Sequence, residues 1–437
     1  MSQRKSSPKG VRKQSKLRDL GAAAVGNMMA PLASFASAPI LAQALGVSER
    51  GELAAATAPF LFASIAATVG VPESITFFTA RRRGGTGLVW RSIPILAVVS
   101  VLAALVIYFA APLIAAGDAR LSLLIQASGV SLLPTAVLAA LRGAAAGHGD
   151  WIAVRNERVI GAVARLAPIA VLAALGSLTV TSAAAIIVLS PLIGALAFIR
   201  LRHHPRSAEV VLQRNMLGYG WRVWIGSLSG ILLSRLDQIL LNPLAGPREL
   251  GLYVVAVNIS DVTLIVMTTV TSIMFTQDAR ERDDAVLAKT ARLTFATMLL
   301  VSVVVGASLP LWVEPFFGAG FHDSIPAAWV MLATYALTAP GVVAGTALGA
   351  RGRPGSRSTS LIVAVVVNCA AVVLLAPHLG ALGTALATFL GNGTAAALNL
   401  FFLHKRIGVE VRHFHAIRVM EIWDLWRAVR SRLVRES

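Results

Sequence analysis

The residues of this sequence that could do chemistry are ionisable and amide side chains inside long apolar segments. In the segment 222–243, Arg235 and Asp237 are two residues apart, about 200° around a helix, so they cannot simply pair with each other. An ionisable group in an apolar medium is costly unless it is paired or faces water. Each of the two must therefore contact another helix or a hydrated cavity, and Gln238 follows them on the same helix.

Three arginines form a second polar feature. Arg155, Arg158 and Arg165 fall within about 80° of one helical face, in and just before the segment 157–175. Together with Arg235 they are the candidate cations for an anionic head group. The candidate coupling or orienting residues are Asp237, Asp261, Asn258, Gln238, Glu73 and Asn27. The alternative is that the set only joins helices, and that Arg155 and Arg158 only mark the cytoplasmic side.

The elements that must position these residues are membrane helices. The chain has 437 residues, of which 56% are hydrophobic and only 14% charged, and its mean hydropathy is +0.73. A soluble domain carries about a quarter charged residues, and a soluble fold could not bury so much apolar surface. The composition therefore predicts an all-α polytopic membrane protein.

Apolar runs of about 20 residues predict about 12 transmembrane helices. Their estimated bounds are 20–45, 53–79, 91–116, 121–141, 157–175, 179–200, 222–243, 251–276, 292–312, 326–349, 359–376 and 381–403. Between these segments, 35 basic residues fall on one side and three (Arg50, Arg120 and Arg248) on the other. By the positive-inside rule, both termini are then cytoplasmic.

Two sequence patterns recur at nearly the same offset. The triplet Glu-Arg-Gly at 49–51 is matched by Glu-Leu-Gly at 249–251, and a GxxxG pattern at 143–147 is matched at 345–349. These offsets of 200 and 202 residues predict two parallel six-helix lobes. The lobes would be related by a pseudo-twofold axis along the membrane normal, an arrangement that suits alternating access.

The chain then has five predicted parts. They are a basic cytoplasmic tail at 1–19, an N-terminal lobe at 20–200, a cytoplasmic linker at 201–221, a C-terminal lobe at 222–403 and a basic tail at 404–437. In the last part, Val411, Phe414, Ile417 and later apolar residues recur near helical spacing. We expect an amphipathic helix on the anionic lipid of the inner leaflet, and a helix that docks a partner is the alternative.

Motifs of enzymes and cofactor sites are missing from the sequence. It contains no P-loop, no GxGxxG that opens a helix after a strand, no HExxH and no GxSxG. The net charge of +18 sits in clusters between apolar runs, which is typical of membrane topology rather than of nucleic-acid binding. We therefore expect no catalytic activity, no cofactor and no nucleic-acid partner, and coupling to H⁺ or Na⁺ stays open.

At these residues the chain resembles a family, the polysaccharide flippases (O-antigen flippases among them) of the multidrug/oligosaccharidyl-lipid/polysaccharide exporter superfamily. The segments that carry the resemblance are 40–56 (ILAQALGVSERGELAAA), 71–75 (VPESI), 235–238 (RLDQ), 249–253 (ELGLY), 352–355 (GRPG) and 379–383 (LGALG). The resemblance implies two six-helix lobes in a V-shaped, alternating-access fold. It also implies the transfer of a glycan linked to polyprenyl pyrophosphate from the inner to the outer leaflet, for cell-surface polysaccharide synthesis.

Two other functions stay open at this point. One is a cation-coupled multidrug antiporter of the same fold, and the other is a non-transporting membrane scaffold. We expect a monomer in the plasma membrane of a bacterium, with the lipid-linked glycan and anionic lipids as partners. Glycan polymerase or ligase machinery is a further candidate partner.

Overall fold

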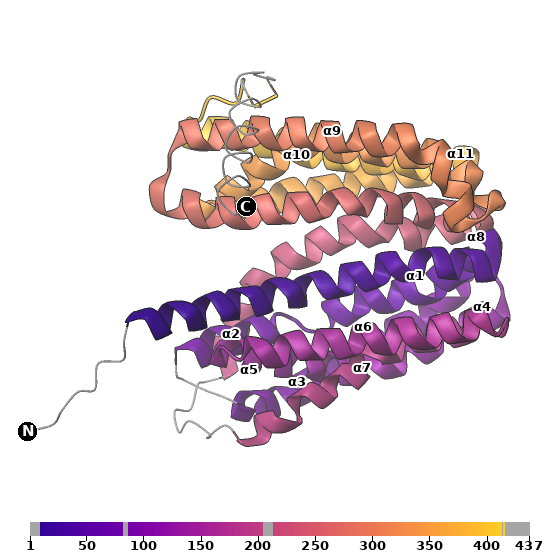
Figure 1. Cartoon of the computed structure of the whole chain (residues 1–437), viewed down its shortest axis with the longest axis horizontal. Helices are drawn as coiled ribbons and strands as arrows, with labels where there is room; N and C mark the ends of the chain where they lie inside the picture. Colours follow the sequence, from indigo (N-terminus) through magenta and orange to yellow (C-terminus); the bar gives the residue numbers. More distant parts are fainter. Residues whose placement is uncertain (1–8, 82–85, 204–212, 413, 416–437) are drawn as a thin grey trace, which may run out of the picture. The chain divides into compact units, whose positions relative to one another are not determined.

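A computed structural model describes residues 9–81, 86–203, 213–412 and 414–415, and they form an almost entirely helical chain (Figure 1). The helices are α1 (Lys9–Ala66), α2 (Val71–Ala80), α3 (Thr86–Ile114), α4 (Ala119–Ser128), η1 (Gly129–Ser131), α5 (Leu132–His148), α6 (Trp151–Ala174), α7 (Val180–Gly194), η2 (Ala195–His203), α8 (Gln213–Glu281), α9 (Asp284–Phe317), η3 (Ala319–Ser324), α10 (Ile325–Ala350) and α11 (Pro354–Ile407).

The described helices include seven segments that are long and apolar enough to cross a membrane. The chain is therefore an α-helical multi-pass membrane protein, as the composition predicts. The count of about 12 crossings stays a prediction. Helix α6 is not among the seven segments, because Arg155, Glu157, Arg158 and Arg165 all lie within its 24 residues.

Contacts divide the chain into two compact units. Unit 1 comprises Met1–Leu228 and Gly246–Gly251, and unit 2 comprises Ser229–Ala245 and Leu252–Ser437. The division between the units therefore falls inside α8, after the predicted linker at 201–221. A short stretch of α8, Gly246–Gly251, returns to unit 1.

Two of the long helices are broken at glycines that lie 200 residues apart in the sequence. Gly46 in α1 has φ 73° and ψ −176°, and Gly246 in α8 has φ 87° and ψ 172°. A residue with a Cβ rarely adopts a positive φ, so glycine is needed at both positions. The two breaks share the offset at which the sequence pattern recurs.

The chain just after one break packs closely against the chain just after the other, inside unit 1. A Cβ added to Gly51 would lie 1.7 Å from the carbonyl oxygen of Pro247. A Cβ added to Gly251 would lie 2.0 Å from the carbonyl oxygen of Val47. The contact is therefore reciprocal. Each glycine leaves room for the backbone of the residue that lies four positions before the other glycine.

The rest of unit 1 is built from small and apolar contacts between helices. Helix α1 packs along α6, and α2 packs against α5 (Figure 1). In the GxxxG pattern of α5, a Cβ on Gly143 would lie 2.5 Å from the carbonyl oxygen of Pro72, and one on Gly147 would lie 2.6 Å from Cβ of Thr79. These glycines therefore permit the close approach of α2, as small residues commonly do between membrane helices.

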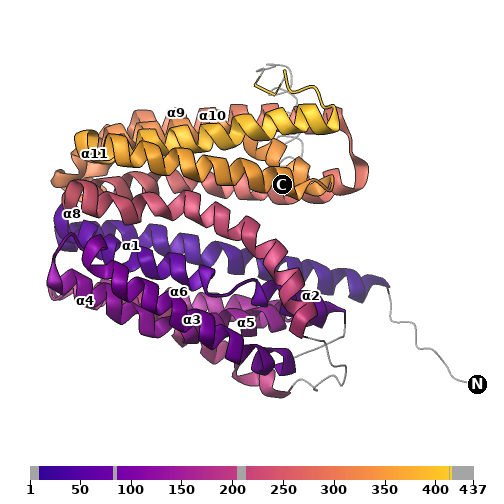
Figure 2. The same ribbon diagram turned by 180° about the vertical axis from the view of Figure 1, so that it is seen from behind.

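In unit 2, α10 packs against both α9 and α11, and the three helices lie side by side in both views (Figure 1 and Figure 2). A buried apolar cluster fills one end of this bundle and includes Leu287, Val343 and Leu403. Val409 and Phe414 belong to the same cluster and are 1% and 0% exposed.

The burial of Phe414 corrects the predicted amphipathic helix at 404–437. Helix α11 continues to Ile407, and the described residues after it are not helical. The prediction that Phe414 faces the lipid is wrong, because its ring is enclosed by unit 2. Residues 416–437, which hold the rest of the predicted helix, lie outside the described residues.

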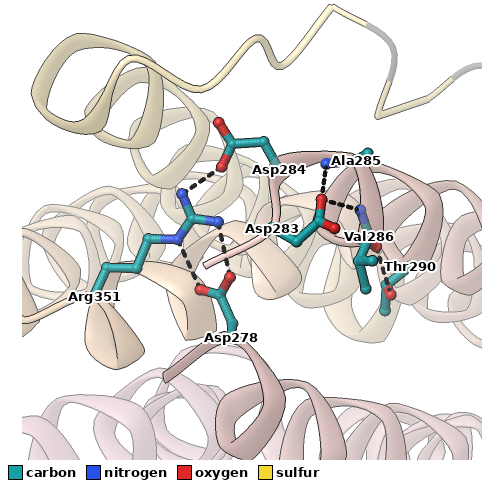
Figure 3. Close-up of polar contacts among 7 residues, drawn as sticks. All are labelled: Asp278, Asp283, Asp284, Ala285, Val286, Thr290 and Arg351. Atoms are coloured by element: carbon teal, nitrogen blue, oxygen red, sulfur yellow. Dashed lines mark hydrogen bonds and ion pairs between the residues drawn. The ribbon is translucent and has the colours of Figure 1, made fainter. Parts of the chain in front are cut away.

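An ion-pair cluster joins the ends of α8 and α10 to the start of α9, and its Arg351–Asp278 pair is buried (Figure 3). Arg351 donates from Nε and Nη2 to the two carboxylate oxygens of Asp278, at 2.9 and 2.8 Å, and from Nη1 to Asp284 at 2.5 Å. These hydrogen bonds to Asp278 raise the pKa of Arg351 above its usual value. The neighbouring Asp283 caps α9 by accepting hydrogen bonds from the backbone N–H groups of Ala285 and Val286.

Candidate functional site

Unit 2 contains a cavity of about 290 Å³ at the place where its polar helices meet. Its polar lining is formed by Ser234, Arg235, Asp237, Tyr253, Asp261, Tyr335, Thr388 and Asn392. These residues come from α8, α10 and α11. Three of the predicted site residues, Arg235, Asp237 and Asp261, therefore lie around one space, as candidate ligand-binding groups should.

Of these three charged residues, Asp237 is the most enclosed, with only 2% of its surface exposed. Its Oδ1 accepts a hydrogen bond from the backbone N–H of Gln238 at 2.7 Å, and its Oδ2 accepts one from the hydroxyl of Tyr253. Thr388 Oγ1 lies 3.3 Å from Oδ2 and 3.0 Å from the Tyr253 hydroxyl. This network holds the carboxylate in one orientation beside the cavity.

Arg235 is half-buried and makes a single hydrogen bond within the part of the chain that the structure describes. Its Nη1 donates to Oε1 of Gln238 at 3.3 Å. The charge of Arg235 acts on both Asp237 and Asp261 without a direct ion pair among the described residues. The sequence argument that Arg235 and Asp237 do not pair agrees with this geometry, and most of the guanidinium N–H groups are left for another acceptor.

Asp261 lies on the second half of α8 and is half-buried. The hydroxyl of Tyr335 donates to its Oδ1 at the long distance of 3.4 Å. Asn258, one turn earlier, does not line the cavity, and its buried Nδ2 has no hydrogen-bond partner among the described residues. Gln238 contributes through its hydrogen bonds to Arg235 and Asp237.

The other predicted head-group cations, Arg155, Arg158 and Arg165, lie in unit 1 on α6. Arg155 donates to Oδ1 of Asn156 at 3.2 and 2.9 Å, and Arg158 Nη1 lies 3.5 Å from the carbonyl oxygen of Gly26. Both partners are neutral, so neither hydrogen bond neutralises the arginine.

A bidentate ion pair involves Glu157, which lies between Arg155 and Arg158 in the sequence of α6. Arg142 of α5 donates to both carboxylate oxygens of Glu157, at 3.0 and 2.7 Å. Only 3% of the Glu157 side chain is exposed, and Arg142 neutralises the charge of this buried carboxylate. Arg155 and Arg158 therefore keep a net positive charge on this part of α6.

Glu73 and Asn27 complete the set of predicted site residues. Glu73 lies in the first turn of α2 and is exposed. The side chain of Asn27 lies outside the part that the structure describes.

Five polar residues near the site were not among the predicted ones. Tyr253, Tyr335, Thr388 and Asn392 line the cavity, and Asn368 of α11 is fully buried with no hydrogen-bond partner among the described residues for either side-chain atom. The two tyrosines gave a weak signal in the sequence, since three of its 4 tyrosines lie inside predicted membrane segments and Tyr108 is one of them. Threonine gives a weaker signal, because it often bonds to its own helix, as Thr388 does to Thr384.

Among the described residues, no group of three or more His, Cys, Asp or Glu side chains is arranged so that it could hold a metal ion. The cavity instead offers two carboxylates, one guanidinium and several hydroxyl and amide groups. Such a set can bind an anion through Arg235, or exchange a proton or a monovalent cation at the carboxylates.

Comparisons with known proteins identify a family and a fold. The family model described as "Polysaccharide biosynthesis protein" matches residues 17–275. A comparison with curated proteins finds no match.

Several solved structures have a similar fold. The lipid II flippase MurJ in an inward closed conformation has a TM-score of 0.72 at 12% identity, over 94% of this chain and 92% of that chain. An inward-facing multidrug resistance MATE family transporter of the MOP superfamily has a TM-score of 0.67 at 17% identity, over 85% of this chain and 94% of that chain. A MOP superfamily transporter from Pyrococcus furiosus has a TM-score of 0.60 at 16% identity, over 92% of this chain and 99% of that chain. At these identities the similarity shows a shared fold.

Proposed function

Since the chain belongs to the polysaccharide biosynthesis protein family, we propose that it moves a lipid-linked glycan from the inner to the outer leaflet of a bacterial cell membrane. The carrier lipid is a polyprenyl pyrophosphate, and transport follows alternating access. The family membership and the fold shared with a lipid II flippase support this proposal.

The observation that carries the proposal is that Arg235 lines the cavity of unit 2 without an ion pair among the described residues. A guanidinium inside a membrane segment is costly, and Arg235 has only an amide as its hydrogen-bond partner among the described residues. A pyrophosphate offers several charged oxygens in the planar, two-point geometry that arginine prefers. Arg235 therefore binds the phosphate-bearing head group, and the arginines of α6 are additional cations for the same class of ligand.

Asp237 and Asp261 take a second role in this proposal. Both carboxylates line the cavity with Arg235, and their total charge exceeds that of the arginine when both are ionised. A proton or a monovalent cation bound by one of them would change the net charge that the head group meets. Asp237 and Asp261 thus couple transport to H⁺ or Na⁺ or orient Arg235.

The test is transport by purified protein in proteoliposomes, with a polyprenyl-pyrophosphate-linked oligosaccharide in one leaflet. Movement is measured as access of a membrane-impermeant glycosidase to the glycan, per folded molecule. Loss of a charge-assisted contact of about 1.5–3 kcal/mol should slow transport roughly 10- to 150-fold in Arg235→Ala. Arg235→Lys should keep part of the activity, because the charge remains and the planar donor does not.

The control is Arg353→Ala, which removes an exposed arginine from the turn after α10. It should transport at the rate of the unchanged protein. A folded Arg235→Ala variant with full transport would remove Arg235 from the site, and absence of any glycan transport by the unchanged protein would reject the proposed function.

A cation-coupled antiporter for cationic drugs is the second candidate. The two carboxylates in the cavity favour it, because they would attract a cationic substrate. The same proteoliposomes separate the two functions: an antiporter would move a cationic dye against a proton or sodium gradient and would leave the lipid-linked glycan in place.

A further inference from the structure

The two carboxylates of the unit 2 cavity differ in how their oxygens are occupied. Only 2% of Asp237 is exposed, and both of its oxygens have partners. Oδ1 accepts the backbone N–H of Gln238, and Oδ2 accepts the hydroxyl of Tyr253 and lies 3.3 Å from Thr388 Oγ1. A proton or cation that arrives at Asp237 must disturb this network, so Asp237 is held as a fixed part of the structure.

Asp261 has a more open environment. It is half-buried, and its one hydrogen bond among the described residues is the long contact of 3.4 Å from the Tyr335 hydroxyl to Oδ1. Its Oδ2 makes no hydrogen bond within that part of the chain, and the residue lines the cavity. A carboxylate oxygen without a hydrogen bond can gain and lose a proton and leave the structure around it intact.

The charged and titratable residues that line the cavity beside Asp261 come from two helices. They are Arg235, Asp237 and Tyr253 of α8 and Tyr335 of α10, whereas α11 contributes the neutral Thr388 and Asn392. Tyrosine ordinarily ionises near pH 10 and arginine above about pH 12, so neither changes its charge near neutral pH. A change of charge in the cavity near neutral pH therefore belongs to a carboxylate, and of the two Asp261 has the oxygen without a hydrogen bond.

We propose that Asp261 is the carboxylate that takes up a proton together with the anionic head group, while Asp237 keeps one protonation state. The proton comes from bulk water and forms an O–H bond on Oδ2 of Asp261, which removes one negative charge from the cavity that Arg235 lines. When Asp261 is ionised it competes with the head group for the guanidinium, and when it is protonated Arg235 is left to the anion. The identity of the anion rests on the proposed function, whereas the coupling of proton uptake to anion binding does not.

Thermodynamic linkage makes this coupling reciprocal. If a proton on Asp261 raises the affinity for an anion, the anion raises the affinity of Asp261 for a proton by the same factor. The affinity of the cavity for an anion therefore rises as the pH falls through the range in which Asp261 becomes protonated. A pyrophosphate carries more negative charge than one proton offsets, so a membrane potential that is negative inside still favours outward movement of the complex.

The experiment measures binding of inorganic pyrophosphate to the full-length protein in detergent, by titration calorimetry over a range of pH around neutrality. The unchanged protein should bind roughly 5-fold or more tightly at the low end of the range, beyond the contribution of the ligand's own titration. Asp261→Asn imitates the protonated carboxyl and should lose this additional dependence on pH. The titration of pyrophosphate is common to both proteins and cancels in the comparison. Calorimetry in buffers of different ionisation enthalpy should also show a smaller uptake of protons by Asp261→Asn.

The matched control is Glu410→Gln, which makes the same kind of change at an exposed carboxylate after α11 and should bind like the unchanged protein. Asp237→Asn keeps Asp261, so its affinity should still depend on pH. Loss of the pH dependence in Asp237→Asn and its persistence in Asp261→Asn would overturn the proposal. Should Asp261→Asn fail to fold, Tyr335→Phe removes the hydroxyl that contacts Asp261 and should shift the midpoint of the pH dependence, and an unchanged midpoint would count against Asp261.

The coupling ion and the proposed function are tested separately. A pyrophosphate affinity that depends on the concentration of Na⁺ and not on pH would overturn the assignment of a proton, as would absence of pyrophosphate binding by the unchanged protein. Binding with the expected pH dependence but without glycan transport in proteoliposomes rejects the proposed function and keeps the proton site at Asp261. Glycan transport with the same pH dependence of binding in Asp261→Asn as in the unchanged protein rejects the proton site alone.

Discussion

Among single residues, Arg351 tests how much a buried ion pair contributes to stability. It holds Asp278, of which 1% of the side chain is exposed, by two hydrogen bonds (Figure 3). Arg351→Gln would leave this carboxylate buried without its cation, and such a loss costs about 3–5 kcal/mol. We expect a clearly lower unfolding temperature, measured by a thermal-unfolding assay in detergent, whereas Arg353→Gln in the same exposed turn should change little. Equal unfolding temperatures for the two variants would mean that the buried pair does not stabilise unit 2.

Polar residues in apolar segments were the part of the site that the sequence could reveal. Arg235, Asp237 and Asp261 stand out because a charge at membrane depth must have a reason, and the three line one cavity. The partners that fix Asp237 could not be derived in the same way. Thr388 lies 151 residues away on another helix, and only the fold brings the two together. The sequence also misplaces Arg50. Its position between two predicted spans suggests an exposed charge, but the side chain is buried.

At the scale of helices, Gly51 tests the reciprocal contact between the two broken helices. An alanine there would place a Cβ 1.7 Å from the carbonyl oxygen of Pro247, and backbone cannot yield as a side chain can. We expect Gly51→Ala to destabilise the protein by at least about 1–3 kcal/mol, although alanine alone favours a helix. Gly393→Ala in α11 is the control, since a Cβ there meets nothing within 4 Å and should be neutral or stabilising. Unfolding temperatures of the two variants decide the matter, and an unaffected Gly51→Ala would contradict the close contact.

The sequence was informative about helices where a pattern is set by local chemistry. The offset of 200 residues marks two glycines with nearly the same backbone angles, because the turn itself demands glycine. The segment after α11 shows the limit of such reasoning. Apolar residues at helical spacing suit a membrane surface or a protein core equally well. Phe414 belongs to the buried cluster that includes Leu287 and Val343, and spacing in the sequence could not identify these residues as members of the same cluster.

For the whole molecule, the distribution of charged residues between the units bears on the proposed transport. Cationic groups occur in both units, as Arg235 in unit 2 and as Arg50, Arg155, Arg158 and Arg165 in unit 1. The carboxylates that could bind a coupling cation, Asp237 and Asp261, belong to unit 2. In the proposed function, a phosphate-bearing head group can thus meet cations in either unit, whereas the proposed coupling uses the carboxylates of unit 2. Variants at Arg235 and at Asp261 would separate the two proposed roles within unit 2.

The orientation of the chain in the membrane is the prediction that belongs to the whole molecule. The 35-to-3 division of basic residues predicts that both termini face the cytoplasm. The single native cysteine, Cys369, is first replaced by alanine, and one cysteine is then introduced at an exposed position. Ser48→Cys, Arg248→Cys and Ala319→Cys should react with a membrane-impermeant thiol reagent in intact cells. His148→Cys and Arg353→Cys should react only after the membrane is permeabilised. Reversal of both groups would mean the opposite orientation, whereas mixed labelling within one group would reject the count of about 12 spans.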